Sequence, residues 1–296
     1  MATTPALTPE LILSELGQSP ARSIEPVTGG ADTQIWRVAL PDGEFALRVL
    51  RPNQQAAVVR ERGAMDAARG AGLPAPGVRT VGEVAGQPAL LIDWLPGMPL
   101  LQAMHEKPWR TWRLGWAFGQ MQARIHQIPA PADVIRGEHA WIDWANPDPE
   151  LATLLLQHAS GGAALLHLDY HPLNVLVRDD AISGVLDWTN ADGGDPRADV
   201  ARTGAILRFL PGNPFWSSRR NTSVRRLLRS GWLQGYQHIA GPLTGMAPFY
   251  AWAGALMQRD LAPRLGRTDL PWLTEEWLAG VQRWTRTWRL RAIAAP

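Results

Sequence analysis

The chain has 296 residues, of which 46% are hydrophobic and 19% are charged, and its formal net charge is +2. That length suffices for the core of one large domain or of two medium-sized domains. The absence of cysteine excludes disulfide bonds and thiolate chemistry, while no apolar run approaches the ~18 residues of a membrane span and no leader-like segment opens the sequence, so we expect a cytoplasmic protein without a membrane partner.

The first ninety-odd residues predict a small lobe rich in β-strands. Runs of β-branched and aromatic residues alternate there with glycine and proline turns, which is typical of antiparallel strands. The expected strands are 22–28, 34–39, 45–50, 78–84 and 88–94, and one helix is expected at 54–69. Gly29 and Gly30 lie in the turn between the first two strands.

Two opposite charges fall on the inward faces of neighbouring elements in this lobe. In the third strand, alternation directs Phe45, Leu47 and Val49 to one face and Arg48 to the other, which is otherwise apolar. Glu61 lies on the inner stripe of the helix. Because an unpaired charge is costly to bury, we predict that Arg48 pairs with Glu61. The alternative is an edge-strand arginine and an exposed glutamate.

The strand pattern ends at Leu95-Pro96-Gly97, and the remainder of the chain is mainly helical. The expected helices are 109–127, 150–158, 199–210, 223–240, 247–261 and 273–291. We therefore expect an α+β protein with an N-terminal domain at 1–95 and a C-terminal helical domain at 96–296. A short segment between two such domains can offer its backbone groups to a planar heterocycle.

A polar motif in the second domain carries the strongest functional signal. Residues 167–174 are His-Leu-Asp-Tyr-His-Pro-Leu-Asn, and Asp187 follows after two short apolar runs. Those runs predict a hairpin, and a turn about residues 180 and 181 would place Asn174 opposite Asp187. An amide oxygen and a carboxylate oxygen would then hold Mg²⁺ together with nucleotide phosphates. Asp169 would accept a hydrogen bond from an attacking hydroxyl, as a kinase requires.

Other interpretations of these residues remain open. His167, Asp169 and His171 are also compatible with a transition-metal cluster of a hydrolase, or with loop residues that only satisfy backbone groups. A Walker-type phosphate loop is excluded, because no Gly-x-x-x-x-Gly-Lys-[Ser/Thr] string exists and Lys107 is the only lysine. His126 precedes the motif on a predicted helix and is expected to be a core histidine with satisfied polar atoms.

Residues 24–210 resemble the aminoglycoside phosphotransferase and choline kinase family of the protein-kinase-like superfamily. The segment 167–174 resembles the family's catalytic loop, 186–188 its metal-binding segment, and 194–201 the string that follows. The resemblance implies a two-lobed kinase-like fold, in which a small five-stranded antiparallel lobe with one helix precedes a larger helical lobe. It also implies a phosphotransferase that uses Mg²⁺ and moves the γ-phosphate of ATP or GTP to a hydroxyl of a small molecule.

The resemblance also implies a role for individual residues. Those in the second lobe are the catalytic base Asp169, the Mg²⁺ ligands Asn174 and Asp187, and the supports of the loop, His167 and Asp199. Those in the first lobe are the phosphate-covering turn with Gly29, Gly30 and Thr33, the ion pair of Arg48 with Glu61, and the adenine-contacting linker with Asp93 and Leu95.

Two departures from the kinase pattern bear on function. Protein kinases have a lysine where this chain has Arg48, and the glycine turn is not Gly-x-Gly-x-x-Gly. A pseudokinase, or a nucleotide-binding module without transfer activity, is therefore the alternative function. The chain also lacks an Ala-Pro-Glu string after Asp187, which favours a small-molecule acceptor over a protein.

The charge of the helical lobe bears on the acceptor. From Ala201 onward, fourteen arginines face four acidic residues, which argues against a strongly cationic acceptor. Acidic residues that can still line an acceptor site are Asp133, Glu138, Asp143, Asp148 and Glu150. No nucleic-acid partner is expected, because arginines on a solvated helix face are the commoner explanation for such a basic region. The sequence leaves the oligomeric state open.

Overall fold

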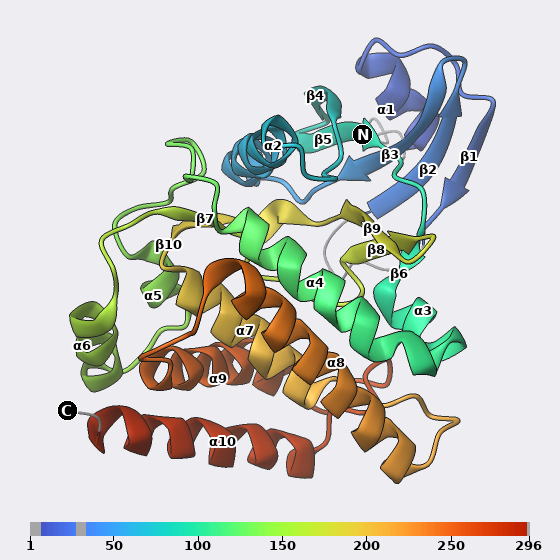
Figure 1. Ribbon diagram of the computed structural model, residues 1–296. Coiled ribbons are helices and arrows are strands. Elements are labelled where there is room, and N and C mark those ends of the chain that lie inside the picture. The colour runs from blue at the N-terminus through green and yellow to red at the C-terminus, as the bar shows by residue number, and fades with distance from the viewer. Residues whose placement is uncertain (1–6, 28–33, 295–296) are drawn as a thin grey trace.

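The structure, a computed structural model, describes residues 7–27 and 34–294 and consists of two lobes, one above the other in Figure 1. The N-terminal lobe is the expected five-stranded antiparallel sheet, in the order β1-β2-β3-β5-β4. Its strands are β1 (Ser23–Pro26), β2 (Gln34–Leu40), β3 (Gly43–Val49), β4 (Val78–Val84) and β5 (Gln87–Asp93). Two helices accompany the sheet, α1 (Pro9–Glu15) and the predicted α2 (Gln55–Gly70).

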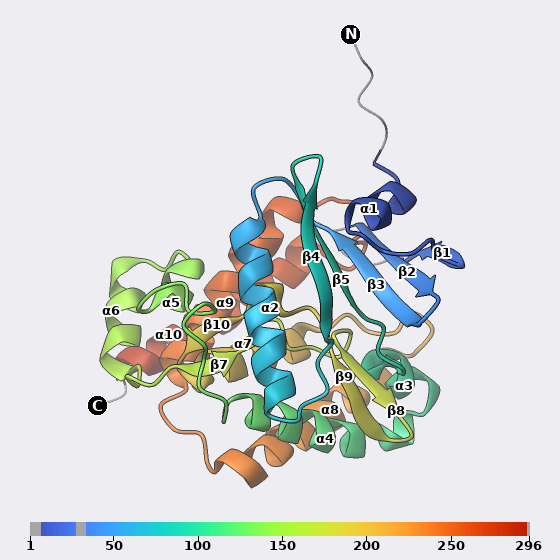
Figure 2. The same cartoon turned by 90° about the horizontal axis from the view of Figure 1, so that it is seen from above.

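Alternation along β3 divides its side chains between two cores, as the sequence predicts. Leu47 and Val49 pack with Ile12 and other apolar residues of α1, whereas Ala46 belongs to the larger core that includes Met65 of α2. In Figure 2, α2 runs beside β4. Helix α1 packs on the opposite face of the sheet, where Ile12 shares a core with Leu47 of β3 and Leu91 of β5. Consequently, the α2 side of the sheet is the one that faces the second lobe.

The helix α1 was absent from our sequence prediction, although its signals are present. Thr8 caps the helix by accepting a hydrogen bond from the backbone nitrogen of Leu11 at 3.4 Å. Pro9 follows in the first turn, and Glu10 adds a negative charge there. Capping of this kind satisfies backbone donors that a helix leaves unpaired at its start.

The C-terminal lobe combines helices with short strands (Figure 1). Its helices are α3 (Leu100–Glu106), α4 (Thr111–Ile125), α5 (Ala140–Trp144), α6 (Pro149–His158), α7 (Pro196–Phe209), α8 (Ser218–Ala240), α9 (Ala247–Leu261) and α10 (Glu275–Ala294). Its strands are β6 (Met98–Pro99), β7 (Ala164–Leu166), β8 (Val175–Arg178), β9 (Ala181–Val185) and β10 (Asp192–Gly194). The short elements α3, α5, β6, β7 and β10 were not predicted, since each spans at most two helical turns or three strand residues.

Two helices begin earlier than predicted because of their caps. The side chain of Asp195 accepts a hydrogen bond from the backbone nitrogen of Arg197 at 2.9 Å, so α7 begins at Pro196. Ser217 Oγ accepts from the backbone nitrogen of Arg220 at 3.3 Å, so α8 begins at Ser218. In both cases a capping side chain and the first helical turn precede the apolar stripe on which the prediction relied.

Helices α4 and α8 touch through their backbones. Four glycines line this contact, which we call the glycine seam: Gly115, Gly119, Gly231 and Gly235. A methyl group at Gly119 would clash with the carbonyl of Trp232, and one at Gly235 with the carbonyl of Trp116. Because the obstructing atoms are backbone, the two helices could accept a larger side chain only by moving apart.

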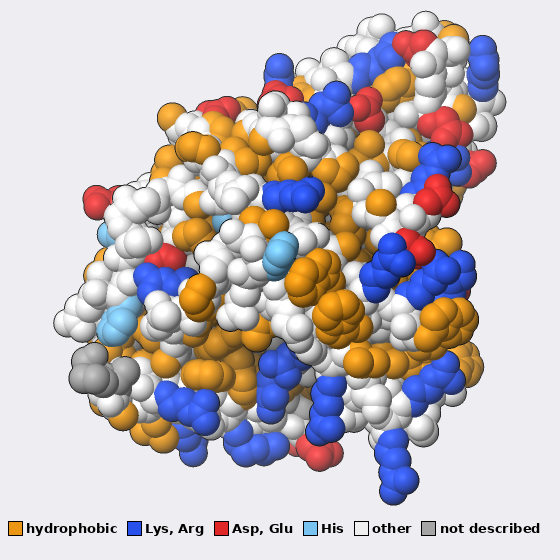
Figure 3. All heavy atoms as spheres, viewed as in Figure 1, with side chains coloured by type: hydrophobic (Ala, Val, Ile, Leu, Met, Phe, Trp, Pro, Cys, Tyr) orange, Lys and Arg blue, Asp and Glu red, His pale blue; other side chains and the backbone are white. Residues whose placement is uncertain are grey.

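Arginine side chains gather on the lower part of the helical lobe, as Figure 3 shows for one face of the molecule. This distribution agrees with the excess of arginine in the last third of the sequence. Within residues 7–27 and 34–294, no helix combines the length and the apolar character that crossing a membrane requires.

Candidate active site

The polar loop, residues 167–174, begins where β7 ends, and one buried carboxylate holds its backbone. Asp199, in the first turn of α7, accepts hydrogen bonds from the backbone nitrogens of Leu168 at 2.9 Å and of His167 at 3.1 Å. Leu168 has a φ of 59°, a left-handed conformation that is costly for a residue with a side chain. The two hydrogen bonds stabilise this conformation, so Asp199 positions the residue that follows, Asp169.

Asp199 also ends a chain of buried hydrogen bonds that reaches α8. Its Oδ2 lies 2.9 Å from Nε2 of His126, whose Nδ1 lies 2.8 Å from the hydroxyl of Tyr236. Burial acts to raise the pKa of Asp199, but the hydrogen bond and charge of His126, aided by His167, outweigh it and lower that pKa. His126 is thus a core histidine with both ring nitrogens bonded, as predicted.

His167 joins the start of the polar loop to the segment before Asp187. Its Nε2 lies 3.0 Å from the carbonyl oxygen of Leu186, and its Nδ1 accepts a hydrogen bond from the backbone nitrogen of Asp169 at 3.3 Å. Burial lowers the pKa of His167, and the nearby carboxylates of Asp199, Asp169 and Asp187 oppose this shift only in part. The ring is therefore neutral and donates from Nε2.

Asp169 is partly exposed and stays ionised. Its Oδ2 lies 3.5 Å from Nε2 of His171 and 3.5 Å from Nδ2 of Asn174. Burial acts to raise the pKa of Asp169, but the hydrogen bond from His171 and the charges of His171 and Arg202 hold that pKa well below its usual range. A carboxylate of such low pKa is a weak proton acceptor, so its main capability is to orient a hydroxyl by accepting its hydrogen bond.

Strands β8 and β9 form the predicted hairpin, but our predicted register is wrong. The backbone nitrogen of Leu186 donates to the carbonyl of Asn174 at 2.8 Å, so Asn174 lies opposite Leu186 instead of Asp187. The turn consists of Asp179 and Asp180, both with positive φ, and a bulge at Ser183 of β9 changes the register by one residue. Asp187, which we predicted to lie opposite Asn174, is therefore one residue beyond the last paired position of the hairpin.

A left-handed backbone conformation at Asp187, with φ of 60° and ψ of 67°, turns the chain away from the hairpin into η2 (Trp188–Asn190). Its Oδ1 lies 2.8 Å from Oγ1 of Thr189 and 3.4 Å from Nη2 of Arg48. With 46% of its side chain exposed, Asp187 remains accessible to a ligand. The turn therefore places this carboxylate between the two lobes.

The predicted ion pair between Arg48 and Glu61 is present and buried. Nη1 of Arg48 binds Glu61, while Nη2 reaches Asp187 and, at 3.2 Å, Thr189. Burial alone would lower the pKa of Arg48, but Glu61 and Asp187 more than compensate, and the pKa is raised. Burial raises the pKa of Glu61, and the charge and hydrogen bond of Arg48 oppose this shift in part. The two Nη atoms of this arginine divide these partners between them, one facing Glu61 and the other facing Asp187 and Thr189.

Thr189 is a member of this site that the sequence did not reveal. Its Oγ1 lies 2.8 Å from Asp187 and 3.2 Å from Glu61. It follows Asp187 by two residues, which is the only sequence signal that could have identified it.

We expect Thr189→Val to lower kcat/KM for the nucleotide by about tenfold, since a lost hydrogen bond to a charged group costs ~1.5 kcal/mol. Steady-state kinetics with varied nucleotide would measure this change. Thr287→Val is the matched control, because the Thr287 hydroxyl is exposed and, among the described residues, bonds to the carbonyl of Arg283 in its own helix. Equal kinetics for the two variants would contradict a role for Thr189.

Asn174 and Asp187 offer oxygen atoms suited to Mg²⁺. The amide nitrogen of Asn174 donates to the carbonyl of Asp169 at 3.1 Å, which leaves its Oδ1 for another partner, and Oδ2 of Asp187 has no hydrogen bond within the described residues. These oxygens, with nucleotide phosphates, match the preference of Mg²⁺. No three His, Cys, Asp or Glu side chains in the described ranges are arranged to hold a metal, so His167, Asp169 and His171 do not support the hydrolase interpretation.

Of the remaining first-lobe residues that the resemblance implicates, the structure describes Asp93 and Leu95 but not the glycine turn. Gly29, Gly30 and Thr33 lie outside the described residues. Asp93 is the last residue of β5, and its carboxylate accepts a hydrogen bond from the backbone nitrogen of Gly77 at 2.9 Å. Leu95 lies in the segment between the lobes, against β9, where a Cβ on Gly184 would lie 3.0 Å from its Cδ1.

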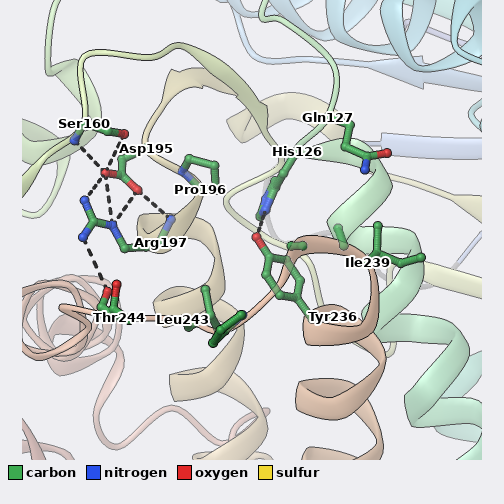
Figure 4. A pocket seen from close by; sticks show the side chains of 13 residues that line it. His126, Gln127, Ser160, Asp195, Pro196, Arg197, Tyr236, Ile239, Leu243 and Thr244 are labelled. Carbon is green, nitrogen blue, oxygen red and sulfur yellow. Dashed lines mark hydrogen bonds and ion pairs between the residues drawn. The ribbon is translucent and has the colours of Figure 1, made fainter.

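Two hollows lie away from these carboxylates. One, of about 510 Å³, lies behind the polar loop and is lined by His126, Tyr236, Asp195 and Arg197, among others (Figure 4). In that view, His126 and Tyr236 point toward each other at one side of the hollow, and Asp195 and Arg197 pair at the other. The second hollow, of about 700 Å³, lies between residues 96–114 and the tip of the β8–β9 hairpin. Neither hollow is lined by Asp169, Asn174 or Asp187.

Comparison with known proteins gives a family match and a common fold. The model of a family described as phosphotransferase enzyme family matches residues 23–241. No protein with curated function is similar enough in sequence to match.

Several solved structures share the fold of the whole chain. A thermostable mutant of the aminoglycoside phosphotransferase APH(4)-Ia, in a ternary complex with AMP-PNP and hygromycin B, superposes with a TM-score of 0.67 at 16% identity and covers 98% of this chain and 100% of its own. A putative fructosamine-3-kinase from Haemophilus somnus gives 0.62 at 14% identity, with 94% and 96% covered. The macrolide 2'-phosphotransferase MphH from Brachybacterium faecium gives 0.56 at 19% identity, with 86% and 92% covered. These similarities show the two-lobed protein-kinase-like fold.

Proposed function

The chain belongs to the phosphotransferase enzyme family, and from this premise we propose that it moves the γ-phosphate of ATP or GTP to a hydroxyl of a small molecule. The N-terminal lobe, residues 1–95, would bind the nucleotide, and residues 96–296 would supply the polar loop and the acceptor site. Solved relatives of the same fold have been crystallised with AMP-PNP and with ADP, which supports a nucleotide donor.

The observation that carries the proposal is the contact between Arg48 of the first lobe and Asp187 of the second lobe, at the boundary between the lobes. Arg48 and Glu61, from the first lobe, contact Asp187 directly or through Thr189. His167 in turn links Asp169 to Leu186, the residue before Asp187. A buried, charged arginine beside a partly exposed carboxylate is an arrangement that suits triphosphate oxygens and a cation.

In the proposed reaction, the acceptor hydroxyl oxygen bonds to the γ-phosphorus while the bond to the β–γ bridging oxygen breaks. ADP or GDP leaves, and the hydroxyl proton is released to water. Asp169 aligns the hydroxyl, and Arg48 stabilises charge on the phosphates. Asn174 and Asp187 would hold Mg²⁺, which neutralises phosphate charge when bound. Gly29, Gly30 and Thr33 would cover the phosphates, and the backbone at Asp93 and Leu95 would contact the base.

We expect Mg-ATP or Mg-GTP to raise the melting temperature of the wild type, because a ligand at 100 times its Kd stabilises a protein by ~2.7 kcal/mol. Most of this increase should depend on Mg²⁺ and should disappear in Asp187→Ala. Differential scanning fluorimetry with and without EDTA would measure it, and Asp179→Ala at the exposed hairpin tip is the control. A wild type that neither binds nucleotide nor transfers phosphate to a panel of aminoglycosides, macrolides, amino alcohols and sugars would contradict the proposal.

A further inference from the structure

Three arginines surround one tryptophan in the helical lobe. The guanidinium carbons of Arg136, Arg202 and Arg259 lie 5.4, 5.8 and 5.4 Å from the ring centre of Trp144. They come from the segment before α5, from α7 and from α9, while Trp144 ends α5. We call these four residues the arginine cluster. In Figure 1, α5, α7 and α9 lie below β7 and β10, the strands next to the polar loop.

The cluster lies beside the residues proposed for phosphate transfer. Thr203, the neighbour of Arg202, donates a hydrogen bond to the carbonyl of Tyr170, the neighbour of Asp169, at 3.0 Å. Arg136 donates from Nη2 to the carbonyl of Asn190, at the end of η2, at 3.2 Å. Both sides of the cluster are thus tied to the segments that carry Asp169 and Asp187.

The carboxylates at the cluster do not balance its charge. Asp192 pairs with Arg136 at 2.9 Å, and Asp260 pairs with both Arg202 at 3.0 Å and Arg259 at 2.6 Å. A fourth arginine, Arg60 of α2, is close enough that its pKa is lowered by burial and by the charge of Arg136. With Asp169, whose charge interacts with that of Arg202, four arginines face three aspartates, which leaves one positive charge at this place.

Two donors of these arginines also lack a partner. The Nε atoms of Arg202 and Arg60 are buried and make no hydrogen bond within the described ranges. A buried N–H without an acceptor is unfavourable, and an anionic ligand oxygen would satisfy it.

Part of the acidic stretch that could have served a cationic acceptor is engaged elsewhere. Asp148 and Glu150 both bind Arg289 of α10, and Asp148 also caps α6. Glu138 is almost fully exposed. The carboxylates that do lie at the cluster, those of Asp192 and Asp260, already have arginine partners. A polycation there would meet an excess of like charge.

We propose that the acceptor is a hydroxylated small molecule that carries a carboxylate or phosphate group, which binds the arginine cluster against Trp144 while its hydroxyl lies at Asp169. This inference rests on the proposed function and assigns its acceptor class. Guanidinium groups bind such oxyanions in a fork geometry, and an indole ring packs on the face of a sugar or similar carbon skeleton.

The test compares compounds that share a ring and differ in charge: D-glucuronate, D-glucose 6-phosphate, D-glucuronamide and D-glucosamine. Isothermal titration with each into the Mg-ADP-loaded wild type should show at least one of the two anions binding about tenfold more tightly than the amide and the amine. The anion that binds more tightly identifies carboxylate or phosphate as the preferred group. Arg259→Gln should reduce this preference to about threefold or less.

Arg178→Gln is the matched control, because Arg178, like Arg259, is exposed and pairs with the next residue in the chain. Arg178→Gln should leave the preference for the anions over the amide and the amine unchanged. Equal binding of all four compounds, tighter binding of the amine, or no binding of either anion would overturn the inference. Failure of the wild type to bind Mg-ADP would instead count against the proposed function, so the two failures are distinguishable.

Discussion

Asp169→Asn is expected to lower kcat about 10²- to 10⁴-fold while it changes the nucleotide Kd no more than about threefold. The carboxylate lies at the end of the strained turn at Leu168, 3.5 Å from Nδ2 of Asn174. An amide at this position has nearly the same shape but lacks the charge that attracts a hydroxyl proton. The loss should therefore fall on the chemical step and leave ground-state nucleotide binding intact. Single-turnover transfer and nucleotide titration would measure the two effects separately.

Asp179→Asn at the hairpin tip controls for the change of a carboxylate to an amide, since that side chain is 93% exposed. Retention of more than about a tenth of the wild-type kcat by Asp169→Asn would exclude Asp169 as the group that orients the hydroxyl. If the wild type binds nucleotide but transfers no phosphate, and Asp169→Asn binds equally well, the pseudokinase alternative is supported instead.

Asp199→Ala is expected to destabilise the protein by about 3–5 kcal/mol, the usual cost of removing one partner from a buried charged network. Three donors would lose their acceptor: the backbone nitrogens of His167 and Leu168, and Nε2 of His126. Chemical denaturation of the variant and the wild type would give this difference. Asp66→Ala, at an exposed position of α2, should change stability by less than about 0.5 kcal/mol.

The stability difference between wild type and Asp199→Ala should also depend on pH. The pKa of Asp199 is lowered in the folded protein, so its ionised form stabilises the fold at pH values above the ordinary carboxyl value of 3.8. The contribution is lost as the pH falls from there toward the folded-state pKa. Denaturation curves between pH 7 and pH 3 would show the difference narrowing at the acid end, and a difference that grows on acidification would contradict the assignment.

Local patterns in the sequence were sufficient to predict most of the longer elements and one contact between elements, but not α1 or the short elements of the second lobe. Strand alternation and helix periodicity each directed one charge inward, and burial then required Arg48 and Glu61 to meet. The β8–β9 hairpin followed from its apolar runs, but its register did not. The bulge and the positive φ angles of Asp179 and Asp180 determine the register, and neither follows from hydrophobic pattern.

Contacts between distant segments were beyond prediction from one sequence. The bond between His126 and Asp199 joins residues 73 positions apart, and nothing in either local sequence indicates the other. The arginine cluster likewise draws on three separate segments around Trp144. The counting of charges along the chain identified an excess of arginine, but only the fold shows which arginines lie beside Asp169.

The glycine seam gives a remote part of the molecule control over the polar loop. His126 follows the last residue of α4, and Tyr236 lies in α8 next to Gly235, so the hydrogen bond between them spans the contact of these two helices. That bond leads through Asp199 to the backbone of the loop. This chain of bonds connects the separation of the two helix backbones to the backbone that positions Asp169, so we expect the proposed phosphate transfer to be sensitive to packing at the glycine seam.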